Sequence, residues 1–248
     1  MIHNPRRKFL KSTIIWSAAA SLPLVGNATA ITPPLANSTN LKILFQGDSI
    51  TDGNRSRNND WNHVMGHGYQ YIISSKLWYE HPERKFHFFN RGVSGNKVSD
   101  LAGRWQTDTL DIKPDILSVL IGVNDSNEAI NNNPAYTKES YNQGYRDLLY
   151  RAQAGNPHLK FVICEPFLLP VGQVKNNWER WSEEVQSRQI VARDIAREFK
   201  AVFVPFQSAF NEALKRAPAD YWIWDGIHPM PAGHELMART WLKSVKSI

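Results

Sequence analysis

The chain has 248 residues, of which 42% are hydrophobic and 21% are charged. These values are ordinary for a soluble globular protein, and the length suits one well-buried domain better than two large ones. The formal net charge is +6, but four basic residues fall within the first thirty positions, where no acidic residue stands. Removing those four charges leaves +2 (6 − 4). Because no basic run follows, we do not expect a nucleic-acid partner.

The first thirty residues have the pattern of an export signal. Arg6 and Arg7 open a basic segment that resembles the twin-arginine motif, an apolar stretch covers residues 12–26, and A-T-A at 28–30 matches a cleavage site. The apolar stretch is shorter than the roughly twenty residues that a spanning helix needs. We therefore expect cleavage after Ala30, no stable membrane anchor, and export of the mature protein to a periplasm.

The remaining chain is predicted to form one α/β domain. Residues 31–40 are rich in Pro, Thr, Asn and Ser and are expected to be a linker, with the domain spanning 41–248. Strand candidates are the apolar runs 41–45, 86–89, 116–121, 161–164 and 201–204. Helices are expected at 69–79, 98–110, 138–154, 178–199, 207–215 and 232–245. Apolar strands that alternate with helices are typical of a parallel sheet covered on both faces. We predict a three-layer α/β/α sandwich with a central five-stranded parallel sheet.

Cysteine and histidine patterns give no sign of a disulfide or a metal site. Cys164 is the only cysteine and lies in an apolar run, where a small buried hydrophobic residue is expected. His63 and His67 are four positions apart, but glycines surround His67, and the metalloprotease pattern H-E-x-x-H is absent. We expect neither a metal nor an organic cofactor.

Polar segments follow three of the predicted strands, and a fourth lies near the C-terminus. They read GDSITD (47–52), NRGVSG (90–95), GVND (122–125) and DGIHP (225–229). Each alone has ordinary turn composition. Because ligands of parallel sheets bind at the carboxyl ends of the strands, we expect these segments to meet there. Together they supply a serine, a histidine base, a carboxylate and N–H donors, which are the parts that ester hydrolysis needs.

The four segments, in this order, resemble the sequence blocks of the SGNH (GDSL) hydrolase family. The segments GHGYQYI (66–72), NRGVSGNKVSDLAGRW (90–105) and IWDGIHPMPAGHELMAR (223–239) are similar in particular to its acetylxylan esterase branch. The resemblance implies that 41–248 is an SGNH hydrolase catalytic domain. It implies that Ser49 is the nucleophile, His228 the base and Asp225 its orienting acid. The oxyanion hole would consist of the Ser49 and Gly92 backbone N–H groups and the Asn124 side-chain amide.

The resemblance also implies a substrate, an acetylated oligo- or polysaccharide such as acetylated xylan or xylo-oligosaccharides. Trp224 directly precedes the Asp-His segment, and aromatic faces stack on sugars, so we expect Trp224 to bind substrate. We also expect Asp48, which directly precedes Ser49, to contact the substrate. Residues 124–133 are expected to form an Asn-rich polar loop, which favours a small acyl group on a polar carrier.

Three questions stay open at this point. A lipid or thioester acyl hydrolase of the same fold is an alternative, as is a carbohydrate-binding protein without catalysis. The related esterases are oligomers, so a homo-oligomer is considered, but the residues define no interface. The segment 54–61, rich in Arg, Asn and Trp, is either a substrate rim or a contact surface.

Overall fold

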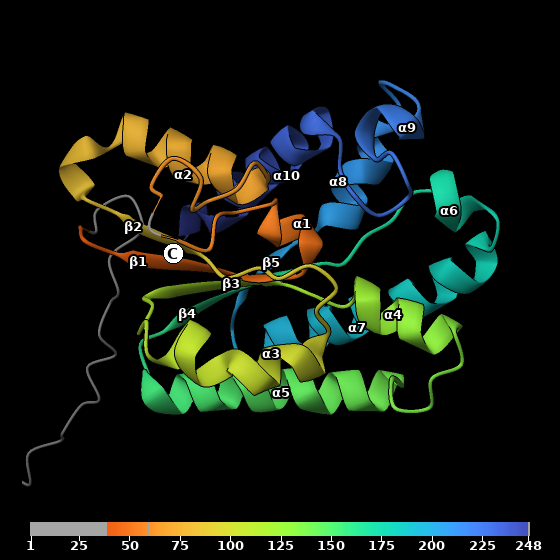
Figure 1. Ribbon diagram of the computed structural model, residues 1–248, viewed down its shortest axis with the longest axis horizontal. Helices are drawn as coiled ribbons and strands as arrows, with labels where there is room; N and C mark the ends of the chain where they lie inside the picture. Colours follow the sequence, from red (N-terminus) through yellow and green to blue (C-terminus); the bar gives the residue numbers. More distant parts are fainter. Residues whose placement is uncertain (1–38, 59, 248) are drawn as a thin grey trace, which may run out of the picture. The chain divides into compact units, whose positions relative to one another are not determined.

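A computed structural model describes residues 39–58 and 60–247 of the chain. Five parallel strands form one sheet in the order β2-β1-β3-β4-β5 (Figure 1). The strands are β1 (Lys42–Gly47), β2 (His87–Asn90), β3 (Ile116–Leu120), β4 (Lys160–Cys164) and β5 (Val202–Val204). The predicted α/β fold is thereby confirmed. The predicted export signal and nearly all of the linker lie outside the described residues.

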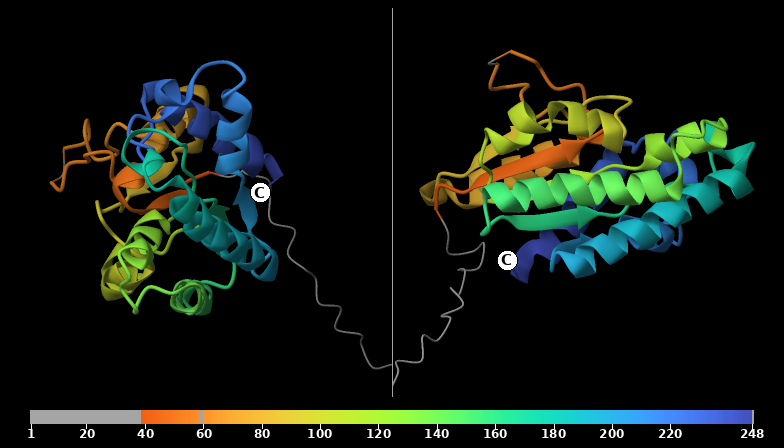
Figure 2. Two further views of the ribbon diagram at one scale, coloured as in Figure 1. Left: turned by 90° about the vertical axis from the view of Figure 1, so that its right-hand side faces the viewer. Right: turned by 90° about the horizontal axis from the view of Figure 1, so that it is seen from below.

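Helices cover both faces of the sheet. In the left view of Figure 2, which looks onto the carboxyl ends of the strands, one group of helices lies above the sheet and another below it. The upper group is α2 (Tyr69–Glu80), α8 (Phe206–Ala213) and α10 (Pro231–Ser244), and the lower group is α3 (Val98–Trp105), α5 (Lys138–Gly155) and α7 (Trp178–Glu198).

Alternate side chains of the strands enter two separate cores. Ile43 and Phe45 of β1 pack into one core together with Trp241 of α10, whereas Leu44 enters the other together with Tyr145 of α5. Because both faces of the central strands β1, β3 and β4 are buried, these strands are apolar at consecutive positions, as the sequence indicated. Within the described residues, no helix combines the length and apolar character needed to cross a membrane.

Several short elements were not predicted. They are α1 (Ser49–Asp52), α4 (Val123–Ile130), α6 (Gly172–Lys175), α9 (Ala219–Trp222), the 3₁₀ turns η2 (Pro82–Arg84) and η4 (Val245–Ser247), and the π-helical turn η3 (Gln106–Leu110). The expected polar loop at 124–133 is wrong for most of its length, because α4 occupies it. This helix packs against α7 and buries Val123 and Ile130, and this packing outweighs the weak helix propensity of its Asn and Asp residues.

The strand order positions a site at the carboxyl ends of the strands. The chain moves from β1 outward to β2 and then crosses back to β3, so the direction of progression reverses between β1 and β3. In open parallel sheets, ligands bind in the crevice outside this switch point. Ser49, Gly92 and Asn124 follow β1, β2 and β3 respectively, and therefore all lie at this edge.

Candidate active site

Ser49 is the first residue of α1, two positions after β1 ends. The Asp48 side chain caps this short helix by accepting a hydrogen bond from the Ile50 N–H at 3.0 Å. As a first-turn residue, Ser49 has a backbone N–H for which the helix supplies no internal acceptor. Its hydroxyl and its N–H are thus both placed at the carboxyl end of the sheet.

Asp225 and His228 lie in the loop between α9 and α10. The Asp225 Oδ1 atom accepts hydrogen bonds from the backbone N–H groups of Ile227 at 2.9 Å and His228 at 2.7 Å. Gly226 turns the chain with a φ of 98°, a conformation that favours glycine. The loop backbone therefore orients the carboxylate independently of the histidine side chain.

Hydrogen bonds join the three predicted residues. The Ser49 Oγ lies 2.8 Å from the His228 Nε2, and the His228 Nδ1 lies 2.6 Å from the Asp225 Oδ2. With neutral imidazole protonated on Nδ1, that nitrogen donates to Asp225 and Nε2 accepts from the serine hydroxyl. This geometry allows a base to remove the hydroxyl proton of a nucleophile.

The surroundings of the pair favour an ionised Asp225 and a basic His228. Burial alone would raise the pKa of Asp225, but hydrogen bonds from the His228 side chain and from two backbone N–H groups bring this pKa below its usual value. The hydrogen bond to Asp225 raises the pKa of His228 above its usual value, although burial acts in the opposite direction.

The expected oxyanion donors lie at the same edge, but one of them already has an acceptor. The Asn124 side-chain amide donates one hydrogen bond to the Asn96 carbonyl at 3.1 Å and has a second N–H. The Gly92 N–H, the second expected donor, donates to the Asn90 Oδ1 at 2.9 Å. A ligand oxygen would have to share this N–H with Asn90 or replace it.

Only glycine allows the loop after β2 to approach α1 as it does. A Cβ atom at Gly92 would lie 2.2 Å from the Asp52 N and 2.6 Å from the Thr51 carbonyl carbon, both of them backbone atoms. The neighbouring Val93 N–H donates to the Gly47 carbonyl at 3.1 Å. The two loops that carry Ser49 and Gly92 are therefore packed directly on each other.

Asn90 ties these loops together and was not singled out from the sequence. Its buried Nδ2 donates to the carbonyls of Thr51 at 2.7 Å, Asp52 at 3.1 Å and Met65 at 3.0 Å. Its place in the NRGVSG segment at the end of β2 was the available signal. Its partners lie 25 to 39 positions away, so the local sequence could not reveal them.

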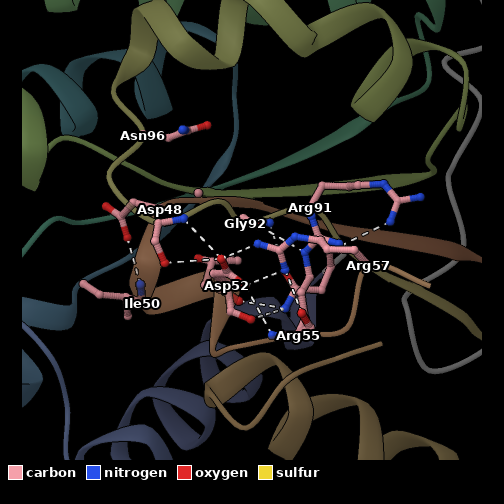
Figure 3. A network of polar contacts seen from close by, with 12 residues as sticks. Asp48, Ile50, Asp52, Arg55, Arg57, Arg91, Gly92 and Asn96 are labelled. Carbon is pink, nitrogen blue, oxygen red and sulfur yellow. Dashed lines mark hydrogen bonds and ion pairs between the residues drawn. The ribbon is translucent and has the colours of Figure 1, made fainter. Parts of the chain in front are cut away.

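A polar network supports the Gly92 loop from the other side (Figure 3). Asp52 accepts hydrogen bonds from the two terminal nitrogens of Arg57 at 2.9 and 2.6 Å, and from the N–H and hydroxyl of Ser94. Burial would raise the pKa of Asp52, but the bonds from Arg57 hold it below its usual value. The Arg55 Nε donates to the Gly92 carbonyl at 3.1 Å. Both polar backbone groups of Gly92 are therefore held by side chains.

The position of Asp48 does not agree with a substrate-binding role. Its side chain points inward as the cap of α1, and the residue is only 1% exposed. Within the described chain its Oδ2 has no hydrogen-bond partner, and burial raises its pKa to about 7. Asp125 is similar, with burial raising its pKa to about 6. Both carboxyl groups lie in the interior, so substrate contact by Asp48 is not supported.

Trp224 does lie beside the catalytic candidates. Its ring is nearly parallel to that of His228, with 6.4 Å between the ring centroids and 27° between the planes. The residue is 61% exposed, whereas Trp222 is buried. An open aromatic face therefore flanks the histidine.

His63, His234 and Cys164 have partners outside the proposed triad, and that of Cys164 is the Ser118 hydroxyl. The His63 Nδ1 lies 2.6 Å from the Asp60 Oδ2, and the His234 Nδ1 accepts a hydrogen bond from a backbone N–H. Burial lowers the pKa of His234 to about 4. Cys164 is buried, as predicted, and burial raises its pKa to about 12. Within residues 39–58 and 60–247, no three His, Cys, Asp or Glu residues gather in a way that could hold a metal ion.

Comparisons with known proteins agree with this arrangement. Residues 45–236 match the model of the GDSL-like lipase/acylhydrolase family. An acetylxylan esterase of Geobacillus stearothermophilus is 33% identical to this chain over 212 residues, a match that covers 82% of this chain and 93% of that protein.

Solved structures show the same fold. A Parabacteroides merdae protein described as a GDSL-like lipase superposes with a TM-score of 0.81 at 38% identity, covering 86% of this chain and 99% of its own. The acetylxylan esterase Axe2 of G. stearothermophilus superposes with a TM-score of 0.74 at 30% identity, covering 84% of this chain and 95% of its own. The family match spans most of the chain, and we conclude that this protein belongs to the GDSL-like lipase/acylhydrolase family and is a carboxylic-ester hydrolase.

Proposed function

We propose that this protein is a serine esterase that removes O-acetyl groups from a carbohydrate, with acetylated xylan or xylo-oligosaccharides as the substrate. The observation that carries the reaction is the hydrogen-bonded series of Ser49, His228 and Asp225. The substrate class is supported by the exposed Trp224 beside His228 and by similarity to proteins named acetylxylan esterases.

The proposed reaction begins with proton transfer from Ser49 to His228. As the Nε2 takes the proton, the Oγ attacks the acetyl carbonyl carbon, and the Asp225 carboxylate stabilises the imidazolium that forms. His228 then gives its proton to the sugar oxygen, which leaves as a hydroxyl while the acetyl group remains on Ser49. Water, deprotonated by His228, releases acetate and restores the serine.

Negative charge on the former carbonyl oxygen is stabilised by donors at the ends of three strands. The Ser49 N–H and the second N–H of Asn124 are available, and the Gly92 N–H would be shared with Asn90. Loss of one such donor typically costs about 3–4 kcal/mol of transition-state stabilisation. Three donors around one oxygen would therefore make a large contribution to the rate enhancement.

The exposed aromatic ring beside His228 suits a sugar substrate. Trp224 offers an exposed face on which the apolar face of a sugar ring can stack. Because the Trp224 ring lies beside that of His228, a sugar stacked on it would lie next to the proposed base.

The test is acetate release from acetylated xylo-oligosaccharides by residues 31–248. A Ser49→Ala variant and a long-chain ester, 4-nitrophenyl palmitate, are assayed in parallel. We expect serine-dependent acetate release and little palmitate hydrolysis. Hydrolysis of the palmitate ester alone would keep the mechanism and move the substrate to lipids. A folded protein that turned over neither ester would favour a carbohydrate-binding protein.

We also propose that the chain is exported through the twin-arginine pathway. The support is the motif at Arg6 and Arg7 and the A-T-A segment at 28–30. Expression in a bacterium with this pathway should give a periplasmic protein whose N-terminal residue, determined by mass spectrometry, is Ile31. Retention of the uncleaved chain in the membrane fraction would contradict this proposal.

A further inference from the structure

An arginine-rich cavity of about 470 Å³ lies next to the proposed active site. We call it the arginine pocket and define it by Arg55, Arg57, Asn58, Trp61 and Arg91. The first four come from the 54–61 segment and the last from the end of β2. The pocket borders the oxyanion loop, because Arg91 directly precedes Gly92 and the Arg55 Nε donates to the Gly92 carbonyl.

Positive charge in this pocket exceeds the negative charge that contacts it. Figure 3 shows Arg55, Arg57 and Arg91 near Asp52, and of their guanidinium groups only that of Arg57 binds this carboxylate. Both oxygens of Asp52 accept hydrogen bonds from the Arg57 guanidinium group. The Arg55 Nε donates instead to the Gly92 carbonyl.

The second carboxylate near the pocket is also occupied. Asp108 pairs with Arg104 at 2.9 Å, and its distance of 3.7 Å from Arg91 is too long for a hydrogen bond. A third acid, Asp60, pairs with His63. With histidine neutral, four arginines therefore meet three aspartates, an excess of one positive charge (4 − 3). In the described chain, neither the Arg55 nor the Arg91 guanidinium group donates a hydrogen bond to a carboxylate, although the Arg55 backbone N–H donates to the Asp52 Oδ1 at 3.2 Å.

Arg55 is confined as well as crowded, whereas Arg57 is exposed. Arg55 is partly buried, and burial together with the charges of Arg57 and Arg91 lowers its pKa to about 10. At neutral pH it is still charged, so an anion bound here would reduce the repulsion among the three groups. A carboxylate matches the paired donors of a guanidinium particularly well.

The remaining feature of the pocket is an aromatic ring. Trp61 is 76% exposed, which is a large exposure for a tryptophan. An exposed indole beside hydrogen-bond donors can stack on a sugar ring while the donors bind its polar groups. An extended polyphosphate would instead need a long basic face, and the excess charge here is local.

We propose that the arginine pocket binds a carboxylate-bearing sugar unit of the same saccharide chain whose acetyl group reaches Ser49. This inference rests on the proposed saccharide esterase function and makes the 54–61 segment a substrate rim. Arg55 and Arg91 bind the carboxylate, and Trp61 stacks on the ring that carries it. The protein thereby prefers acidic acetylated saccharides to neutral ones.

The test compares two xylotetraoses without acetyl groups, one neutral and one with a single glucuronic acid branch. Binding to residues 31–248 is measured by titration calorimetry at about 20 mM and about 500 mM NaCl, because ionic contacts near the surface weaken with salt. These ligands contain no ester, so binding is independent of catalysis. Acetate release from neutral acetylated xylo-oligosaccharides by the same preparation reports separately on the proposed function.

We expect the acidic ligand to bind about tenfold more tightly at low salt, as one charge-assisted hydrogen-bonded pair provides. High salt should reduce this preference. Arg91→Gln should remove most of it, Arg91→Lys should retain part of it, and Trp61→Ala should weaken binding of both ligands. Arg151→Gln removes the same charge from an exposed position on α5 and should keep the preference.

Three outcomes would overturn the inference. The first is equal affinity of the wild-type protein for the two ligands. The second is an equal loss of preference in Arg151→Gln and Arg91→Gln, which would reflect net charge alone. The third is tighter binding of a single-stranded oligonucleotide than of the acidic saccharide, which would make the pocket part of a polyphosphate site.

Discussion

Ser49 and Asp225 have different parts in the proposed reaction, and their substitutions should separate them. Ser49→Ala removes the nucleophile and should lower kcat for 4-nitrophenyl acetate about 10⁶-fold, whereas Asp225→Asn should lower it about 10⁴-fold, as in serine proteases with this arrangement. The exposed Ser99→Ala on α3 is the matched control and should keep normal kinetics. Normal turnover by a Ser49→Ala protein that still melts at the wild-type temperature would refute the assignment.

The raised pKa of His228 gives a prediction for the pH profile. The base must be neutral in the free enzyme, so kcat/KM should fall as the pH drops through the pKa of His228. Because the hydrogen bond to Asp225 raises that pKa, the acid limb should lie above about 6.5, the ordinary histidine value. Asp225→Asn removes the carboxylate that raises the pKa of His228 and should therefore move the acid limb of the profile to lower pH. A flat profile down to about pH 4 is incompatible with His228 as the base.

At the scale of single residues, the sequence predicted which residues lie at the site better than it predicted where their side chains point. The sequence blocks identified Ser49, Asp225 and His228, and the structure brings them into hydrogen-bond contact. Asp48 was misjudged because adjacency to Ser49 does not show that a helix N-cap turns its side chain inward. Asn90 was missed because its partners belong to distant segments.

The contact between the β2 loop and α1 gives a prediction about elements. Gly92→Ala would place a methyl group 2.2 Å from a backbone nitrogen, so the loop must move away from α1. We expect a kcat lower by about 10²-fold, since the proposed oxyanion donor would be displaced, together with a lower melting temperature. Steady-state kinetics and thermal unfolding measure both effects.

Gly103→Ala is the matched control for this prediction. A Cβ at this exposed position in α3 would meet no atom within 4 Å. Replacing glycine with alanine inside a helix should stabilise the protein by up to about 1 kcal/mol and leave kcat unchanged. If Gly92→Ala behaved like Gly103→Ala, the close approach of the loop to α1 would be unnecessary for catalysis.

The long helices and the strands were predictable because a repeating pattern of apolar residues can be recognised only over several positions. The five strands and the helices α2, α5, α7, α8 and α10 lie within two residues of their predicted ends. The predicted helix 98–110 changes at Gln106 into a π-helical turn, which apolar periodicity cannot distinguish. Helices of four residues, such as α1, contain about one turn and show no repeat at all.

At the scale of the whole molecule, burial of Asp48 should make the free energy of unfolding depend on pH. Its folded pKa of about 7 exceeds the unfolded value of about 3.9. The native state therefore binds more protons between these values, and the free energy of unfolding should decrease as the pH rises through this window. The decrease amounts to about 1.4 kcal/mol for each unit by which the pKa is raised.

Asp48→Asn tests this contribution, because asparagine also caps helices but carries no charge. Urea unfolding at pH 5 and pH 8 should show the variant gaining stability relative to the wild type as the pH rises. Asp147→Asn, an exposed aspartate on α5, is the control and should follow the wild-type curve. If Asp48→Asn also ran parallel to the wild type, Asp48 would not titrate differently in the folded and unfolded states.

The proposed nucleophile and base lie 179 positions apart, Ser49 just after the first strand to leave the ribosome and His228 just before the last long helix. A nascent chain that ends before residue 228 contains the serine but has no base to activate it. The protein therefore stays inactive through nearly all of its synthesis, and truncated products cannot hydrolyse esters while the rest of the chain is being made. For the same reason, the rate at which activity returns during refolding reports when the two ends of the domain come into contact. Circular dichroism instead reports when the helices between them form.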